Sequence, residues 1–486
     1  MVKYRILNPI FFAIILMALA LSSCKDWLSI APENDLIKEK FWTKTEDVQG
    51  ALAATYDAFR DGAVKSLLFG EVRADLVVIG GNVYDGNFDR IAKSDINSSN
   101  GAVKWTDYYR TINLANTLMF YDNQVFAKDV TFTKKMKDGI DAEAMFLRSL
   151  SYFYLVRVWK DVPLVLEPSI SDTSALFLPK SPEKKVITQI IKDLLIAKDM
   201  AYTTEFKNDG KHPGYFNGRA NKYSIMALLA DVYLWDQQYQ NCINYCDSVS
   251  NSGLFSLEST ETWFNLYNPG NSPVESIFEI QYNDNLNSQE NPFYEDVLNK
   301  SNGLTTGKIV STLFTRDDMR MFGILNGAFK YQGIMLNNPV LRNGTQRDAN
   351  FIYYRYADIL LMRAEAATEL GNFGLANENL RQTAERAGLS PIEITVKDEL
   401  RKAILDERGR EFVVEGKRWF DLLRAAKRNH FEKKQIIIDM ILAGADIQRQ
   451  AVLKTKVFDT MSYYLPIPER EILYNPNMVQ NPFYSR

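Results

Sequence analysis

Three glutamates near the C-terminal end of the chain have the residue type and the spacing of acid chemistry. Glu407, Glu411 and Glu415 recur every four residues, which on a helix places their carboxyl groups on one face. Two carboxyl groups about 5 to 10 Å apart can hydrolyse a glycosidic bond when one of them has a raised pKa. Arginines surround these acids: Arg408, Arg410, Arg418 and Arg424. Because nearby guanidinium groups lower a carboxyl pKa, the pattern favours structural ion pairs over catalysis.

Two other segments match ligand-binding motifs incompletely. Residues 303–308 (GLTTGK) are one residue short of a phosphate-binding loop, and Ile309 follows where the loop requires Ser or Thr. Asp85, Asn87 and Asp89 have the spacing that begins a calcium loop, but neither its glycine nor its bidentate Glu follows. The sequence therefore predicts no cofactor and no metal.

The residue types that most enzymes and DNA-binding proteins need are scarce. The 486 residues include two His and three Cys, which leaves little material for metal sites or His-dependent triads. Lys and Arg number 57 against 60 Asp and Glu, a formal charge of -3, so no basic surface for nucleic acid is expected. Cys242 and Cys246 lie four residues apart in a helical pattern. We interpret them as small buried residues, with a strained disulfide as the alternative.

Most of the chain has the periodicity of amphipathic helices. Apolar residues recur at three- and four-residue spacings in nine segments: Val48 to Phe59, Trp105 to Tyr121, Ala142 to Trp159, Val186 to Met200, Ala220 to Trp235, Tyr239 to Val249, Tyr354 to Leu370, Leu375 to Arg386 and Leu400 to Ala426. Residues 221–246 and 359–376 are close to tetratricopeptide helix pairs, with Gly371 as a helix stop. Stacked pairs of this kind bury one continuous core.

Two inserts interrupt the helices. Residues Gly80 to Gly101 and about 254–350 are rich in Asn, Gly, Ser and Pro, a composition typical of loops. Long irregular segments in a compact domain usually have a function, so we expect the binding site there.

The N-terminus has the three zones of a secretory signal. Lys3 and Arg5 precede an apolar run from Ile10 to Leu21, which is too short to span a bilayer. Residues 21–24 (LSSC) resemble a bacterial lipobox, which implies cleavage before Cys24 and lipidation of that residue. The Lys-Asp pair that follows is similar to the start of surface-exported Bacteroidetes lipoproteins, so we expect a lipid-anchored protein of the cell outer membrane.

Several segments, in order along nearly the whole chain, together resemble the SusD/RagB family of outer-membrane nutrient-binding lipoproteins. They are residues 41–47 (FWTKTED), 70–75 (GEVRAD), 142–154 (AEAMFLRSLSYFY), 354–366 (YRYADILLMRAEA), 407–422 (ERGREFVVEGKRWFDL), 465–469 (LPIPE) and 480–482 (QNP). The resemblance implies a mainly α fold in which tetratricopeptide-like helix pairs form a right-handed helical scaffold with a loop-rich insert.

The same resemblance implies a division of the chain into parts. Residues 1–23 form the signal peptide and 24–36 the lipidated tether. One domain follows, made of a helical part (37–253, with the insert 80–101), a loop-rich ligand-binding part (254–350) and a C-terminal helical part (351–486).

The resemblance also implies partners. SusD-like proteins cover a SusC-like TonB-dependent transporter and pass oligosaccharides to it without catalysis, whereas RagB-like relatives handle peptides. Sugar capture needs aromatic faces and hydrogen-bonding side chains. The inserts supply these candidates: Tyr84, Asn87, Phe88, Arg90, Trp263, Tyr267, Phe293, Tyr294 and Asn302. The first insert contains no Trp, and an equal alternative is that Tyr84 and Phe88 only fix its conformation.

Three hypotheses follow for a non-enzymatic lipoprotein. It captures polysaccharide fragments, it captures peptides, or it is a scaffold that docks proteins through its helical repeats.

Overall fold

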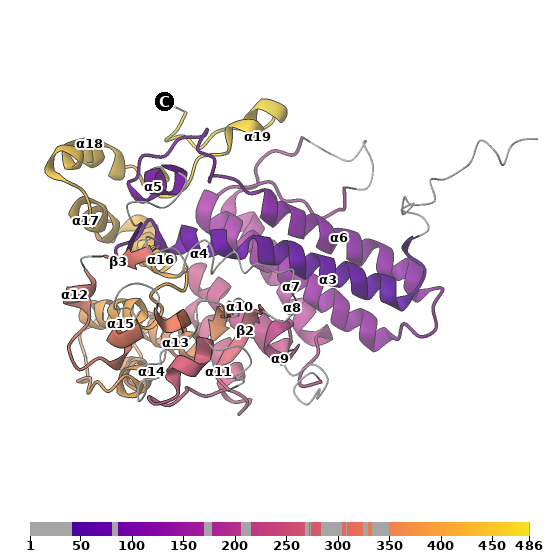
Figure 1. Cartoon of the computed structure of the whole chain (residues 1–486), viewed down its shortest axis with the longest axis horizontal. Coiled ribbons are helices and arrows are strands. Elements are labelled where there is room, and N and C mark those ends of the chain that lie inside the picture. The colour runs from indigo at the N-terminus through magenta and orange to yellow at the C-terminus, as the bar shows by residue number, and fades with distance from the viewer. Residues whose placement is uncertain are drawn as a thin grey trace, which may run out of the picture.

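The computed structural model of the chain (Figure 1) describes residues 41–79, 86–169, 177–205, 215–267, 272, 274–282, 304–307, 309–323, 329–332 and 349–485. This part of the chain is mainly helical. None of its helices combines the length and the apolar composition that crossing a membrane requires. The N-terminal apolar run and Cys24 lie outside the described residues.

Four long helices form the N-terminal part of the fold and lie side by side in Figure 1: α3 (Thr45–Asp61), α6 (Thr106–Phe126), α7 (Lys134–Trp159) and α8 (Glu183–Met200). The helix α4 (Ala63–Glu71) follows α3 directly. The central helix α7 begins at Thr133, whose hydroxyl accepts a hydrogen bond from the Met136 backbone N–H at 3.3 Å. Almost every side chain from Gly139 to Trp159 is buried, so α7 is the core around which the other helices pack.

Paired helices form the second half of the core, and the prediction of tetratricopeptide-like pairs is confirmed. The pairs are α10 (Lys222–Trp235) with α11 (Tyr239–Ser250), and α13 (Tyr356–Glu369) with α14 (Phe373–Arg386). The helix α11 packs on α13, so the two pairs stack, and α15 (Lys397–Glu411) extends the stack. Gly371 has φ +80° just after α13 and ends that helix as predicted, because this conformation favours glycine.

Smaller elements cover the two ends of this frame. The insert regions contribute α5 (Gly86–Ala92), α12 (Val310–Leu313) and the short 3₁₀ turns η1 (Trp263–Tyr267), η3 (Met319–Gly323) and η4 (Phe329–Gln332). The short helix α9 (Tyr215–Gly218) lies between α8 and α10. The C-terminal region adds α16 (Arg418–Phe431), α17 (Gln435–Ala443), α18 (Ile447–Val457), η5 (Thr460–Tyr463) and α19 (Glu469–Tyr474). In Figure 1 the elements α5, α17, α18 and α19 lie together at one end of the molecule.

Two small antiparallel sheets join segments that are distant in sequence. Strand β1 (Val77–Ile79) pairs with β3 (Leu304–Thr306), in a register that places Ile79 opposite Leu304. Strand β2 (Ser276–Ile280) pairs with β4 (Phe351–Arg355), which leads directly into α13. The loop-rich middle of the chain is therefore connected to both helical parts.

The prediction of one continuous helix from Leu400 to Ala426 was wrong. The helix α15 ends at Glu411, and a turn of six residues separates it from α16. In that turn Val414 has φ +60° and Gly416 has φ +75°, and both conformations are incompatible with a right-handed helix.

The two internal cysteines are small buried residues, as interpreted. Cys242 and Cys246 are free thiols with no solvent exposure. The sulfur of Cys242 lies 3.8 Å from the Met362 carbonyl oxygen, where α11 approaches α13. A larger side chain at this position would separate the two helix pairs.

Candidate functional site

The two inserts meet at the sheet formed by β1 and β3. The chain leaves β1 after Ile79, where the first insert begins, and enters β3 at Leu304, and these two residues are partners in the register. The Gly307 backbone N–H also donates to the Leu76 carbonyl at 2.6 Å. Both segments in which we expected a binding site therefore connect to the frame at one place.

Helix α5 holds three of the predicted contact residues. The Asn87 side-chain oxygen accepts a hydrogen bond from the Gly101 backbone N–H at 3.0 Å, and Phe88 is half-buried against the core. These two residues therefore fix α5 to the end of the first insert. The Arg90 Nε lies 3.3 Å from an Asp95 carboxyl oxygen with 43% of the arginine side chain exposed, so Arg90 is the residue of the three that faces solvent.

The charged residues of α5 are paired with residues that directly follow the helix. Asp89, which has the spacing of a calcium ligand, forms an ion pair with Lys93 at 2.6 Å. Among the described residues, no three His, Cys, Asp or Glu side chains gather as the ligands of a metal ion.

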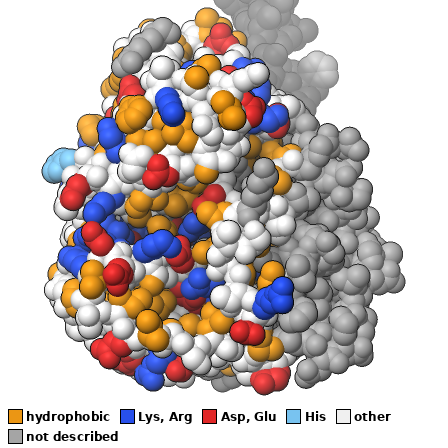
Figure 2. Space-filling model, turned by 90° about the vertical axis from the view of Figure 1, so that its left-hand side faces the viewer, with side chains coloured by type: hydrophobic (Ala, Val, Ile, Leu, Met, Phe, Trp, Pro, Cys, Tyr) orange, Lys and Arg blue, Asp and Glu red, His pale blue; other side chains and the backbone are white. Residues whose placement is uncertain are grey.

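A cleft of about 270 Å³ lies between the inserts and the C-terminal hairpin of α17 and α18. Its lining comes from β1, the end of α5, the residues that follow β3 and the two C-terminal helices, and it includes Val78, Ala92, Gly307, Ile309, Met440 and Leu453. Val78 is 50% exposed and Ile309 is 37% exposed. Figure 2 shows the side of the molecule where α17, α18 and β3 lie, and there hydrophobic side chains are exposed among basic and acidic ones. This mixture suits the binding of a neutral ligand with apolar and polar edges.

The charged groups of this cleft have internal partners. The guanidinium of Arg73 donates to the Tyr463 carbonyl at 2.6 Å and lies 4.1 Å from the centroid of the Trp419 ring. Asp75 accepts hydrogen bonds from Arg418 at 2.8 and 3.0 Å. These contacts stabilise the cleft walls and engage the Arg73 and Asp75 side chains within the protein.

Trp263 and Tyr267 lie inside the protein. Both are in η1, with exposed fractions of 3% and 0%. The Tyr267 hydroxyl donates to Glu415 at 3.0 Å, and its ring contacts the Tyr331 ring at a centroid distance of 4.8 Å. Neither ring presents a face to solvent, so both support the middle segment from within.

The remaining candidates lie outside the described residues. They are the lipidation site Cys24 and the ligand contacts Tyr84, Phe293, Tyr294 and Asn302.

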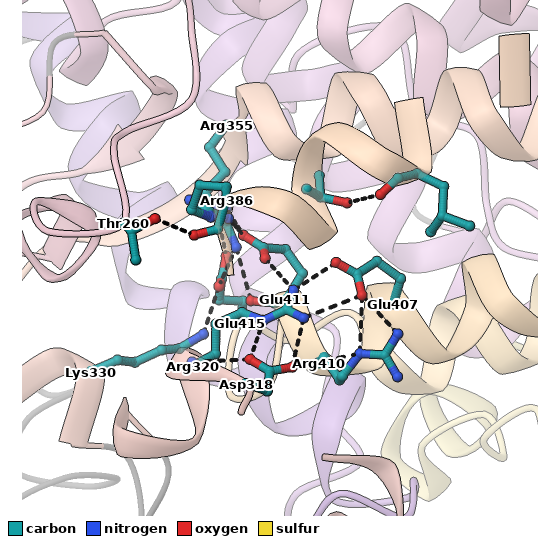
Figure 3. A network of polar contacts seen from close by, with 12 residues as sticks. Thr260, Asp318, Arg320, Lys330, Arg355, Arg386, Glu407, Arg410, Glu411 and Glu415 are labelled. Atoms are coloured by element: carbon teal, nitrogen blue, oxygen red, sulfur yellow. Dashed lines mark hydrogen bonds and ion pairs between the residues drawn. The ribbon is translucent and has the colours of Figure 1, made fainter. Parts of the chain in front are cut away.

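The glutamates that first suggested acid chemistry belong to a buried network of charges (Figure 3). Arg355, the last residue of β4, donates to Glu275 at 2.7 Å, to Glu411 at 2.6 Å and to Glu415 at 3.0 Å. Arg386 of α14 also contacts Glu411. The four partners Arg355, Glu275, Glu411 and Glu415 are shielded from solvent, so the interpretation of these glutamates as ion-pair partners is confirmed. The arginines differ from those expected: Arg410 pairs with Glu407 at 2.8 Å, but Arg408, Arg418 and Arg424 pair with Asp421, Asp75 and Glu365.

The network also holds the middle segment of the chain. Arg320 of η3 donates to Glu407 and to Glu411 at 2.7 Å each, and to Asp318 at 2.9 Å. The Lys330 ammonium of η4 donates to Glu415 at 2.6 Å. Sequence reasoning missed Arg320 and Lys330, because they lie in loop-like sequence far from their partners and match no motif.

The pKa values of these acids are those of ion-pair partners. Burial by itself raises a carboxyl pKa, but Arg386, Arg355 and Arg320 outweigh it and hold the pKa of Glu411 well below its usual range. Burial also opposes the effect of Arg355 and Lys330 on Glu415, yet its pKa falls to about 2. Burial also raises the pKa of Glu407, but Arg320 outweighs this effect, so the pKa of Glu407 is lowered as well. None of the three is suited to act as a general acid at neutral pH.

Glu71 is the exception near this network. Burial raises its pKa to about 8, although its carboxyl group accepts hydrogen bonds from the backbone N–H groups of Gly416 and Lys417, which lower the pKa in part. A carboxyl group with a raised pKa, such as that of Glu71, beside the ionised carboxylate of Glu415 resembles a catalytic pair of acids. Both residues, however, are buried. The cavity that Glu415 lines has about 20 Å³, enough for a water molecule and far too small for a sugar.

Comparisons with known proteins agree with this architecture. A model of the "SusD family" matches residues 225–484, and a model described as "Starch-binding associating with outer membrane" matches residues 26–234. SusD-like protein P38 of Formosa agariphila is 26% identical over 88% of this chain and 93% of its own. SusD-like protein P2 of the same organism is 25% identical over 99% of each chain.

Solved structures share the fold over most of the chain. Surface glycan-binding protein A from Bacteroides uniformis superimposes with a TM-score of 0.72 at 24% identity, covering 90% of this chain and 99% of its own. A laminarin-binding SusD-like protein superimposes with a TM-score of 0.69 at 21% identity, covering 90% and 99% of the two chains. Because both identities are below 25%, these superpositions show a shared fold.

Proposed function

Because the chain belongs to the SusD family, we propose that it is a surface lipoprotein that captures oligosaccharides and passes them to a SusC-like TonB-dependent transporter without cleaving them. The observation on which this proposal rests is the junction of the two inserts. Strands β1 and β3 bring both inserts together beside a cleft with exposed apolar walls. Binding residues from two distant segments can there contact one ligand.

The outer-membrane location is part of the same proposal. The family description of residues 26–234 names association with the outer membrane. Residues 1–23 are proposed to be removed as a signal peptide, and Cys24 then receives the lipid that tethers the protein. The domain that follows has its frame in 37–253 and 351–486 and its ligand-binding part in 254–350 and 80–101.

The proposed ligand is a neutral glycan. Two proteins with the same fold are a surface glycan-binding protein and a laminarin-binding SusD-like protein. Sugar rings require flat apolar faces together with hydrogen-bonding groups, and the inserts supply Tyr84, Phe293 and Tyr294 beside Asn302 and Arg90.

Direct titration tests the proposal. Residues 25–486, which include every described residue, are titrated by calorimetry with starch, laminarin, xylan, pectin and a mixture of peptides. We expect saturable heat with a polysaccharide and no release of reducing sugar. Tyr84→Ala and Tyr294→Ala should each weaken binding about five-fold, the effect of losing one aromatic contact of ~1 kcal/mol. Phe120→Ala, at an exposed position of α6 away from the inserts, is the matched control.

Other outcomes would reject glycan capture. Saturable binding of peptides alone would favour a peptide-capturing lipoprotein, a possibility consistent with the absence of Trp from residues 80–101. Release of reducing sugar by the purified chain would contradict the absence of catalysis.

A further inference from the structure

A second groove lies beside α19, separate from the cleft at the insert junction. Its volume is about 650 Å³, within the range of about 300 to 1,000 Å³ that is usual for small-ligand sites. The first turns of α6, the segments 163–165 and 177–178, and α19 with the residues that follow it form the walls. Of the proposed ligand contacts that the structure describes, none lines this groove.

Two aromatic side chains stand exposed at the groove. Tyr474 of α19 is 64% exposed and Phe177 is 51% exposed. The guanidinium of Arg470 lies 5.5 Å from the centroid of the Tyr474 ring and helps to orient it. Exposing large aromatic side chains costs solvation free energy, so two of them at one groove indicate a surface that another molecule covers.

The walls are held in place by hydrogen bonds. The side-chain amide of Asn475 donates to the Leu178 carbonyl at 2.9 Å, and that of Asn477 donates to the Phe177 carbonyl at 2.7 Å. On the opposite wall the Tyr109 hydroxyl donates to the Pro163 carbonyl at 2.7 Å. A groove fixed in this way loses little conformational entropy when it binds a ligand.

The polar groups of the groove balance in charge. Arg110 and Glu471 are the charged residues in its lining, one of each sign. Arg110 is also paired with Asp61 at 2.9 Å, and 57% of its side chain is exposed. A charged peptide or a phosphate would meet no excess of opposite charge here. A sugar ring would find aromatic faces for its C–H groups and donors and acceptors for its hydroxyl groups.

We propose that this groove is a second subsite, which binds one or a few neutral sugar residues of a longer glycan chain. The inference rests on the proposed function and adds a second point of contact to it. The groove adjoins the first insert, because the Glu469 backbone N–H at the start of α19 donates to the Ser98 carbonyl at 2.9 Å. Trp105 lines the groove four residues after the insert ends. In Figure 1 the helices α5 and α19 lie at the same end of the molecule, so one extended chain can reach both places.

Two variants of residues 25–486, compared with the unmodified chain, test this subsite. Phe177→Ala and Tyr474→Ala are combined in one protein, and Leu473→Ala is the matched control, because Leu473 is 76% exposed on the same helix but does not line the groove. The probe is the polysaccharide that binds the unmodified chain, together with its trisaccharide. We expect the double variant to bind the polysaccharide about five-fold or more weakly, with the control unchanged. Thermal melting should be the same in all three proteins, since the replaced side chains are exposed.

The comparison separates the two proposals. If the unmodified chain binds a polysaccharide and the double variant binds it equally well, the second subsite is wrong and glycan capture stands. A loss for the polysaccharide that exceeds the loss for the trisaccharide supports a subsite for an extended chain. If none of the polysaccharides binds the unmodified chain, both proposals fail.

Discussion

Buried carboxyl groups in this fold differ in whether the effect of burial or that of neighbouring cations on their pKa is the larger. Glu411 and Glu415 contact guanidinium and ammonium groups, which lower their pKa values despite burial. Glu71 has only backbone donors, and its pKa rises to about 8. Asp122 of α6 also has a pKa of about 8, because burial raises it first and the neighbouring Asp141 raises it further, against the effect of Lys137. Carboxyl groups with a raised pKa, such as those of Glu71 and Asp122, take up a proton at neutral pH when the chain folds.

We predict that Asp122→Asn stabilises the protein at mildly alkaline pH. The folded pKa of about 8 exceeds the ordinary value of 3.8, so the unfolded chain binds fewer protons between these limits. The contribution of Asp122 to stability is therefore full below about pH 4 and is lost as the pH rises to about 8. At pH 8 the Asn variant should unfold with a free energy on the order of 1 kcal/mol higher, and this gain should vanish near pH 4. Urea denaturation from pH 4 to 9 measures both.

Asp138→Asn is the control for this measurement. Asp138 lies on α7 and pairs with Lys134 at 2.5 Å near the surface, so its replacement should produce no gain that grows with pH. Identical pH profiles for the two variants would refute the assignment to Asp122.

At the level of elements, residues 407–422 include a turn between two helices at a close crossing with α4. Gly70 of α4 packs against the turn between α15 and α16, where a Cβ atom on Gly70 would lie 1.8 Å from the Gly416 carbonyl oxygen. Gly416 has φ +75°. The crossing therefore needs two glycines. Gly70 is needed because a Cβ atom would not fit there, and Gly416 is needed because its positive φ favours glycine.

Gly70→Ala is expected to destabilise the protein by about 3 kcal/mol or more, because one of the two backbones must move. Gly50→Ala in α3 is the matched control, since a Cβ atom there would have no neighbour within 4 Å. Alanine at that helical position should be neutral or stabilising by up to about 1 kcal/mol. Chemical denaturation of both variants provides the comparison, and equal stabilities would mean that the crossing is looser than described.

The periodicity of the sequence predicted the helices well and their tertiary contacts poorly. The repeats at Val48 to Phe59 and at Tyr239 to Val249 indicated α3 and α11 because each helix buries one face. The same periodicity continues across Val413 and Val414 into α16, so it could not reveal the turn at the crossing with α4.

The tertiary contacts of the candidate site were likewise not predictable from the sequence. The composition of the inserts indicated where irregular structure lies, but β1 and β3 have only three residues each, too few for an alternating pattern to show. Trp263 and Tyr267 have the residue types of a sugar platform, yet both are buried. Exposure depends on neighbours that are distant in sequence, and composition does not report it.

On the scale of the whole molecule, the buried charges join the loop-rich middle segment to the helical frame. Arg320 and Lys330 come from η3 and η4, whereas their partners Glu407, Glu411 and Glu415 lie in α15 and the turn that follows. A buried ion pair adds little net stability over apolar packing, but removing one partner leaves an uncompensated charge. The network therefore fixes the position of the middle segment relative to the frame.

Arg320→Met should accordingly cost about 3 to 5 kcal/mol of stability, since it leaves Asp318, Glu407 and Glu411 buried with one fewer cation. Backbone amides of residues 309–323 should lose protection from hydrogen exchange before those of α13, because η3 is released first. Arg316→Met, at an exposed position of the same segment, is the control and should change neither quantity. If glycan binding at the insert junction depends on the position of the middle segment, it should weaken in Arg320→Met at temperatures where α13 remains protected. Full retention of binding and of amide protection in that variant would show that the middle segment is positioned by other contacts.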